Sequence, residues 1–278
     1  MEEPMEPVVV GVDASAESMS ALDLAAEEAA SRVAPLTVVH VCDSPTDGRV
    51  DQPAAAQRLL AAAVSRALAE HPALSVTAEL LSGVPTDALV EHARHSRLLV
   101  IAHSPRCSGR TIGANSVAHQ VVSRTPVPIM VHRPLYSSAV AQPRPVLLGV
   151  ACAPGDDAVV EFAFEEASSR GAPLLAAHIW PGSVYAGSRQ VWCDFASARD
   201  EADRVLVETL RAWSEKYPDV AVHRMVRHGL DVPVSLTAAS RSAQLVVVGS
   251  RSLDEQMLCP AQVLAHRGGC SVAVVPVA

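Results

Sequence analysis

The chain has 278 residues, of which 49% are hydrophobic and only 3% aromatic, and its formal net charge is −8. The acidic balance argues against general binding to nucleic acids or anionic membranes, because both require a basic protein surface. The length suits two domains of about 140 residues each, near the commonest domain size. A core of Ala, Val and Leu with few aromatic side chains is typical of a parallel sheet covered by helices.

The first half alternates strand patterns with helical ones. Apolar runs predict strands at residues 8–10, 36–42, 74–81, 98–101 and 127–131. Helical spacing predicts helices between these strands, the last of them at 115–124. This alternation implies right-handed crossovers and an open, doubly wound parallel sheet. With the strand order 3-2-1-4-5, the ligand crevice lies at the carboxyl ends of strands one and four.

The second half repeats this order of elements. Gly149 follows Gly11 by 138 residues, and His178 follows His40 by the same interval. Farther on, residues 245–249 match residues 98–102. Residues 134–145 have the composition of a linker. We therefore predict one α/β domain at 1–133, a linker at 134–145, and a second, degenerate copy at 146–278.

One long stretch of the chain lacks acidic residues. Between His92 and Gly155 there is no Asp or Glu, whereas seven arginines fall there: Arg94, Arg97, Arg106, Arg110, Arg124, Arg133 and Arg144. Such a stretch offers a place for a small anion. Alternatively, this Ala-rich sequence simply contains few Asp and Glu residues. The pattern alone leaves both interpretations open.

The six cysteines form no C-x-x-C pair, and no Cys-His spacing suits zinc. We expect reduced thiols in a cytoplasmic protein, and no metal site. The first residues show neither the basic region nor the apolar core of a signal peptide, and no window approaches about 18 uninterrupted apolar residues. The expectation is a chain without a secretion signal or a membrane span.

Several segments together resemble the universal stress protein family: Gly-Val-Asp-Ala-Ser at 11–15, Val-His-Val at 39–41, Gly-Val-Pro at 83–85, and the proline-flanked last strand at 126–131. The resemblance covers nearly the whole of both halves, so the chain is similar to a tandem, two-domain universal stress protein. It implies two five-stranded, adenine-nucleotide-hydrolase-like domains with helices on both faces, paired with each other through their last strands. A homodimer and an unidentified protein partner remain open.

In the ATP-binding branch of that family, the loop after strand four carries G-x-x-G, nine further residues, and G-S or G-T. The glycines let the backbone approach ribose and phosphates, and the hydroxyl donates to a phosphate. Here the three glycine positions fall on Ala102, Pro105 and Asn115, and the hydroxyl is kept as Ser116. Ala102 adds a Cβ, Pro105 removes an N–H donor, and Asn115 remains a good helix N-cap.

The family's adenosine contacts, an Asp after strand one and a Val on strand two, correspond to Asp13 and Val41. The resemblance thus implies that ATP or another adenine nucleotide binds in the first domain. The residues that it implies are Val12, Asp13, Ala14, Val41, Ala102, His103, Ser104, Arg106, Asn115, Ser116 and Val117.

The second half has lost this pattern. Ala151 replaces the Asp that follows the first strand, so the adenosine contact is missing. The sequence Ser-Leu-Asp-Glu at 252–255 predicts a capping box on the next helix, which places two carboxylates where phosphates would lie. We expect no cofactor in the second domain and a structural role for it.

Catalytic interpretations find little support in the sequence. His103 and Ser104 are adjacent, but neither lies in a G-x-S-x-G elbow. The only lysine is Lys216, so a phosphate-binding P-loop is excluded. His40 and His178 are predicted to be hydrogen-bonded core residues rather than metal ligands. Asp13 lacks the cluster of acids that a phosphoacceptor site needs.

Two functions remain. One is a non-catalytic stress-response sensor that binds a nucleotide in its first domain. The alternative is a ligand-free, pseudo-dimeric protein-interaction module. An enzyme is the weakest choice, and we expect no catalytic residues.

Overall fold

The computed structural model describes residues 5–42, 52–103, 116–134, 143–180, 195–229, 231–250 and 259–277. The chain divides into two compact units, Met1–Pro134 and Leu135–Ala278, and each is described by itself. None of the helices in the described ranges is both long and apolar enough to cross a membrane.

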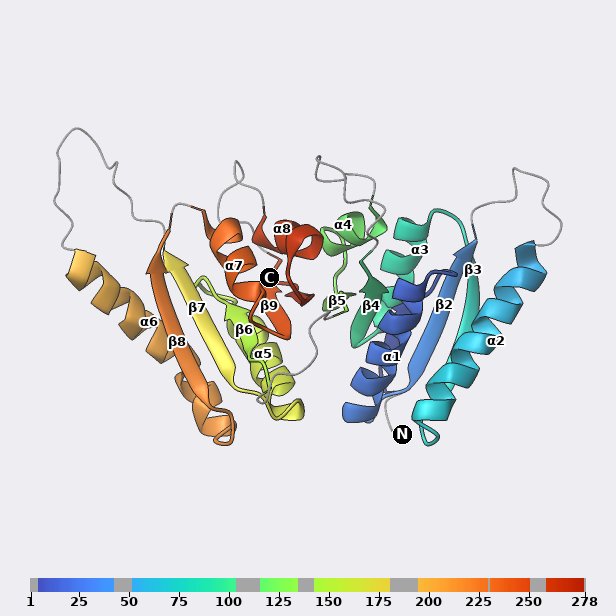
Figure 1. Ribbon diagram of the computed structural model, residues 1–278, viewed down its shortest axis with the longest axis horizontal. Helices are drawn as coiled ribbons and strands as arrows, with labels where there is room; N and C mark the ends of the chain where they lie inside the picture. The colour runs from blue at the N-terminus through green and yellow to red at the C-terminus, as the bar shows by residue number, and fades with distance from the viewer. Residues whose placement is uncertain are drawn as a thin grey trace. The chain divides into compact units, whose positions relative to one another are not determined.

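The first unit is a five-stranded parallel sheet flanked by helices. Its elements are β1 (Val8–Gly11), α1 (Ala16–Ser31), β2 (Leu36–Cys42), α2 (Gln52–Glu70), β3 (Val76–Ser82), α3 (Pro85–His92), the 3-10 turn η1 (Ala93–His95), β4 (Leu98–Ala102), α4 (Val117–Val122) and β5 (Ile129–His132). The strand order is β3-β2-β1-β4-β5, as predicted. The register places Val8 beside both Leu36 and Leu98. Helices α1 and α2 pack together on one face of this sheet, and α3 and α4 pack together on the other (Figure 1).

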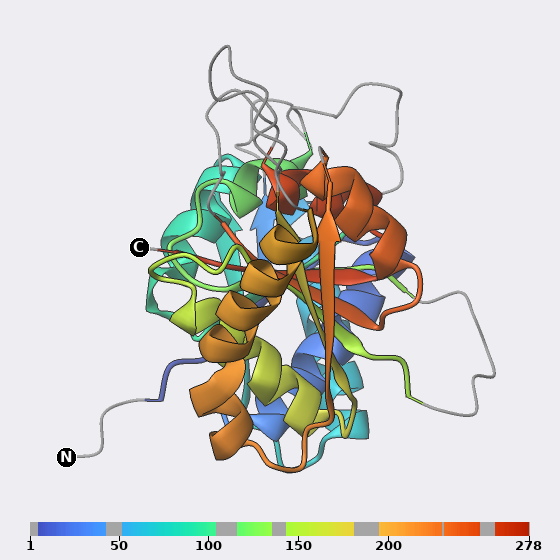
Figure 2. The same cartoon turned by 90° about the vertical axis from the view of Figure 1, so that its left-hand side faces the viewer.

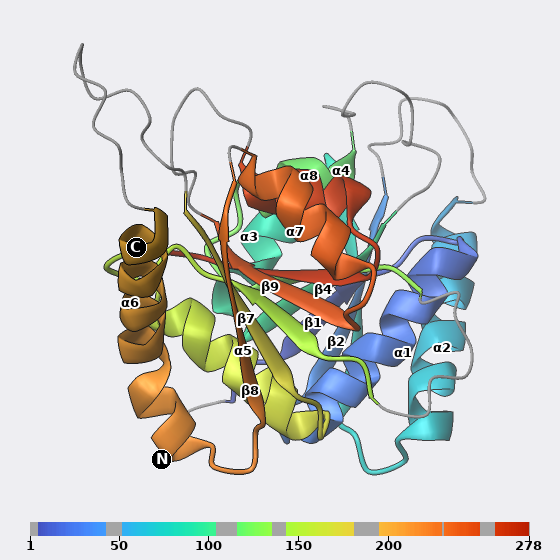
Figure 3. The ribbon, with the colours of Figure 1, turned by 60° about the vertical axis from the view of Figure 1, so that its left-hand side comes forward.

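The second unit repeats the architecture. Its elements are β6 (Val146–Gly149), α5 (Asp157–Ser169), β7 (Leu174–Trp180), α6 (Phe195–Lys216), β8 (Val222–His228), α7 (Val232–Ser240), β9 (Leu245–Gly249), α8 (Pro260–Arg267) and β10 (Ser271–Val275). Its strand order, β8-β7-β6-β9-β10, is the same order as in the first unit. Helix α6 lies along β8 (Figure 2). Helices α5 and α6 contact each other on one side of the strands, and α7 and α8 contact each other on the other side (Figure 3).

The central strands form because nearly every side chain on them is buried. Val8, Val9 and Val10 on β1 are at most 1% exposed, as are Leu98 and Leu99 on β4. Both faces of these strands are covered by helices, so continuous apolar runs are favoured over alternating ones. Small side chains on the inner face of α1 let that helix approach the sheet closely, and four of its alanines are fully or nearly fully buried: Ala21, Ala25, Ala26 and Ala29.

Several predicted boundaries are wrong by one or more residues. The strand predicted at 127–131 begins at Ile129, because Pro126 and Pro128 have no N–H to give to the sheet. The strand predicted at 74–81 begins at Val76. The helix predicted at 115–124 runs from Val117 to Val122, with Ser116 as its N-cap.

The capping box predicted at residues 252–255 does not cap helix α8, the next helix in the structure. Helix α8 begins at Pro260 with Cys259 as its N-cap, so residues 252–255 lie well before its first turn. Those four residues fall outside the described part of the chain. Proline at the first helical position explains the later start, because its fixed φ suits N1 and it needs no partner for an N–H.

Candidate functional site

The first unit contains a cavity of about 310 Å³, here called the first-unit cavity, where β1, β2 and β4 end. It lies at the carboxyl edge of the parallel sheet, where ligands bind in doubly wound folds. The residues that line it are Gly11, Val12, Asp13, Ser18, Val39, His40, Val41, Pro85, Leu89, Ile101, Ala102, Ser116, Val117 and Ala118.

Six of the residues predicted for the site line this cavity: Val12, Asp13, Val41, Ala102, Ser116 and Val117. Ala14 is exposed on the β1–α1 loop and is not among the lining residues. His103 is buried, and its backbone N–H donates to the carbonyl of His132 rather than facing the cavity. Ser104, Arg106 and Asn115 lie outside the described residues, as does Pro105.

The Asp13 carboxylate is held in place by the start of helix α1. Its Oδ1 accepts the Ser15 N–H at 2.9 Å and also the Ser15 hydroxyl. The Ser15 hydroxyl in turn accepts the Ser18 N–H at 3.2 Å, which makes Ser15 the N-cap of α1. Partial burial would raise the pKa of Asp13, but hydrogen bonds from Ser15 and Ser18 and the nearby His40 outweigh it and lower that pKa. The site therefore presents a fixed anionic acceptor.

Ser18 holds the backbone of Asp13 by two further hydrogen bonds. Its hydroxyl donates to the carbonyl oxygen of Asp13 and accepts the Asp13 N–H at 3.2 Å. Ser18 is only 2% exposed, so this arrangement is protected from water. Because both bonds join it to the backbone of Asp13, Ser18 orients that residue.

His40 forms a hydrogen bond that the sequence predicts without identifying its partner. Its Nδ1 lies 2.7 Å from the carbonyl oxygen of Val12, and His178 repeats this bond to Val150 at 3.0 Å. The prediction that both histidines are hydrogen-bonded is confirmed. A carbonyl oxygen can only accept, so Nδ1 carries the proton and Nε2 of a neutral ring is left as an acceptor. His40 also lines the first-unit cavity.

The apolar wall comes from residues that the motif comparison missed. Pro85 and Leu89 reach the cavity from α3, and Val39 and Ile101 reach it from β2 and β4. A Cβ on Gly11 would meet Leu89 Cδ2 at 3.2 Å, so this glycine brings α3 close to the sheet. The signal available in the sequence was that Val39 and Ile101 lie on two predicted strands whose carboxyl ends meet at the edge where ligands bind in this fold.

Ser116 closes the site at the start of α4. It is 8% exposed, and its hydroxyl forms no capping bond with the helix. Thr86 Oγ1 donates to Gln120 Oε1 at 3.1 Å and so ties α4 to α3. The hydroxyl is thus placed at the cavity wall without being used to cap the helix.

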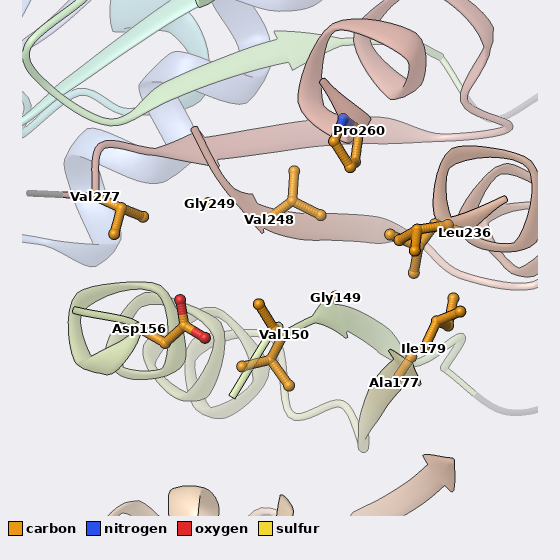
Figure 4. A pocket seen from close by; sticks show the side chains of 12 residues that line it. Gly149, Val150, Asp156, Ala177, Ile179, Leu236, Val248, Gly249, Pro260 and Val277 are labelled. Atoms are coloured by element: carbon orange, nitrogen blue, oxygen red, sulfur yellow. The ribbon is translucent and has the colours of Figure 1, made fainter. Parts of the chain in front are cut away.

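The equivalent cavity of the second unit is much smaller, at about 50 Å³ (Figure 4). Ala151 lines it where Asp13 lines the first-unit cavity. A Cβ on Gly249 would lie 2.7 Å from Val277 Cγ2, so the space left by this glycine is taken by a side chain of the protein itself. Leu236 and Ile179 pack around the remaining space.

Two doubly wound α/β units, with a cavity at the carboxyl edge of the first sheet and a smaller one in the second, define a tandem α/β protein. Comparison with known proteins gives the family. The universal stress protein family model matches the chain twice, over residues 5–133 and 143–276. The chain therefore belongs to the universal stress protein family and carries two tandem domains.

Individual relatives agree with this assignment. Universal stress protein Rv2005c of Mycobacterium tuberculosis is 36% identical over 258 residues, which cover 87% of this chain and 86% of the relative. Universal stress protein Rv2623 of the same species is 32% identical over 266 residues, covering 88% and 86%. The crystal structure of a universal stress protein from Archaeoglobus fulgidus aligns with 98% of this chain and 96% of its own, with a TM-score of 0.72 and 15% identity, which shows a shared fold.

Proposed function

We propose that this protein is a non-catalytic stress-response sensor whose first domain binds an adenine nucleotide and whose second domain does not. The observation that carries the proposal is the contrast between the two cavities, about 310 Å³ in the first unit and about 50 Å³ in the second. A pocket that holds a small organic ligand usually encloses about 300 Å³ or more. By that measure the first-unit cavity has the size for a nucleoside and the second does not.

The chemistry of the first-unit cavity supports the same proposal. Its apolar walls, from residues such as Leu89 and Ile101, suit the faces of a purine base. The Asp13 carboxylate is an acceptor suited to ribose hydroxyls or amino hydrogens. The Ser116 hydroxyl is a donor suited to a phosphate oxygen. These roles agree with those that the family resemblance gives to the Asp and the Ser.

Thermal denaturation tests the proposal directly. Millimolar AMP or ATP should raise the melting temperature, since a ligand that binds only the folded state stabilises it by about 2.7 kcal/mol at 100 times its Kd. The Asp13→Ala variant should lose most of this rise. Asp23→Ala is the matched control, because it removes the same charge from α1 at a surface ion pair with Arg66.

Two results would contradict the proposal. One is the absence of any shift with adenine nucleotides, which would favour the ligand-free interaction module. The other is a shift that Asp13→Ala leaves unchanged. Release of ADP from ATP by the purified protein, above the rate without protein, would contradict the non-catalytic part.

The proposal extends to assembly and location. We propose that the two domains pair through their last strands, as the family resemblance implies. We also propose that the chain works in the cytoplasm, where its thiols would stay reduced. Cys42 and Cys152 are free thiols, which supports a reducing compartment. Light scattering after size-exclusion chromatography distinguishes a single chain of 29.2 kDa from a homodimer.

A further inference from the structure

The small cavity of the second unit, here called the second-unit cavity, contains one charged group in an otherwise apolar wall. Aliphatic side chains surround it, among them Ile179, Leu236, Val248 and Val277. Among the described residues that line it, Asp156 alone has an ionisable side chain. Figure 4 shows the Asp156 carboxylate directed into the space between these side chains.

This carboxylate is held by one backbone hydrogen bond at the wall of the cavity. Asp156 is 8% exposed, and its Oδ2 accepts the Ala153 N–H at 3.0 Å. Although Asp156 is the N-cap of α5, its side chain makes no capping bond. In the described ranges no Arg, Lys or His forms an ion pair with it, since Arg170 and Lys216 pair with Glu166 and Glu161. Buried charges are normally paired, because leaving one unpaired is costly.

Asp156 places the carboxylate of the second unit at a different position from that of Asp13 in the first. Asp156 lies 138 residues after Ser18, and Ala151 lies 138 residues after Asp13. In the first unit the carboxylate is exposed and bonded by Ser15, whereas in the second it is buried beside the cavity. Each unit thus has one carboxylate at this corner, and in the second unit it lies beside the smaller cavity.

The size and charge of the cavity define the ligand. A carboxylate in an apolar space repels phosphates and attracts a cation that can donate hydrogen bonds. One water needs about 10–15 Å³ of such space, so 50 Å³ corresponds to about four water-sized positions. We propose that the second-unit cavity binds a short-chain primary ammonium ion, with its NH₃⁺ group on Asp156 and its alkyl group against Ile179, Leu236 and Val277. This site is separate from the nucleotide site proposed for the first domain and does not depend on it.

The test compares three probes of the same branched shape on the full chain: isobutylammonium, isobutanol and isobutyrate. Binding is followed by amide chemical shifts in ¹H–¹⁵N spectra and by the melting temperature, at one ionic strength kept with NaCl. We expect isobutylammonium to bind at least about tenfold more tightly than isobutanol, and isobutyrate not to bind, because charge pairing favours only the cation. Equal responses to all three probes would overturn the proposal.

Two variants and a control locate the site. Asp156→Asn should remove the preference for the ammonium ion over the alcohol. Asp157→Asn, an exposed neighbour with the same change of charge, should keep it. Ala177→Val installs the residue found at Val39 of the first unit and fills the cavity without touching the carboxylate, so it should abolish binding.

Ala177→Val also decides the case in which Asp156→Asn does not fold. Ammonium binding that survives in a folded Ala177→Val protein would overturn the proposal, because the ligand would then lie elsewhere. Undiminished ammonium preference in a folded Asp156→Asn protein would do the same.

Discussion

Removing the Arg170 guanidinium should destabilise the second unit far more than removing an arginine from a surface pair. Arg170 Nε and Nη2 lie 2.9 and 2.8 Å from one oxygen of Glu166, whose side chain is 0% exposed. Arg170→Ala would leave that carboxylate buried without its cation. Loss of one partner of a buried ion pair costs about 3–5 kcal/mol, and we expect about 3 because Arg170 itself is 20% exposed.

The matched control is Arg204→Ala in helix α6 of the second unit, whereas Arg170 is the C-cap of α5. Arg204 pairs with Glu201, but the two side chains are 72% and 58% exposed. Such exposed pairs contribute about 0.2–1 kcal/mol. Arg170 caps α5 through its backbone N–H, which alanine keeps, and alanine is at least as good a helix former as arginine at Arg204. Neither effect therefore explains a loss of stability.

Urea denaturation followed by tryptophan fluorescence measures this effect in the correct half of the chain. All three tryptophans, Trp180, Trp192 and Trp213, lie in the second half. With a slope of about 2 kcal/mol per molar urea, a loss of 3 kcal/mol lowers the midpoint by about 1.5 M. The midpoint of Arg204→Ala should fall by less than about 0.5 M.

A double variant separates the lost charge from lost packing. Glu166→Met combined with Arg170→Ala removes the buried charge as well as its partner, and should recover at least half of the stability lost in Arg170→Ala. If the double variant is no more stable than Arg170→Ala, the arginine acts through its packed stem and our reasoning is wrong. A midpoint for Arg170→Ala equal to that of Arg204→Ala would refute it as well.

Three further predictions concern single groups. Ser15→Ala should raise the pKa of Asp13 in a ¹³C carboxyl titration. Because the pKa of Asp13 is lowered in the folded protein, its ionised form stabilises the fold above the unfolded pKa of about 3.9. This stabilisation is lost as the pH falls through the folded pKa. Burial raises the pKa of the Cys152 thiol to about 11, so at pH 8 only about one thiol in a thousand is ionised, and mass spectrometry should find Cys152 alkylated by iodoacetamide far more slowly than a free cysteine peptide. Nitrogen NMR at neutral or higher pH should find His40 and His178 in the tautomer with the proton on Nδ1; a proton on Nε2 would contradict the two bonds to backbone carbonyls.

The fold could be predicted because its determinants are local and repeated. Strands covered on both faces are continuous apolar runs, so the run at 98–101 indicates β4 without knowledge of its neighbours. The internal repeat then fixes the order of the elements twice. The errors fall where local chemistry decides the end of an element, as with Pro128 before β5 and Pro260 at the start of α8.

The candidate site could be predicted only in part. Asp13 and Val41 follow from strand ends and from the family resemblance, and both line the first-unit cavity. Leu89 was missed because only the packing of α3 on the sheet brings it there. The narrowing of the second-unit cavity by Val277 was missed for the same reason, because only the folded structure brings Val277 beside Gly249.

Comparison of the two units separates residues that maintain the fold from residues that define a site. His178 and Glu166 repeat the bonds of their counterparts 138 residues earlier, the former to a strand-end carbonyl and the latter to an arginine one helical turn on. Ala151, Asp156 and Ala177 differ from their counterparts, and all three line the second-unit cavity. Since the same sheet forms with either set of lining residues, the fold does not depend on which side chains occupy these three positions. The second unit could therefore change its cavity without losing its fold, and the change is expected to alter which ligand binds rather than whether the domain folds.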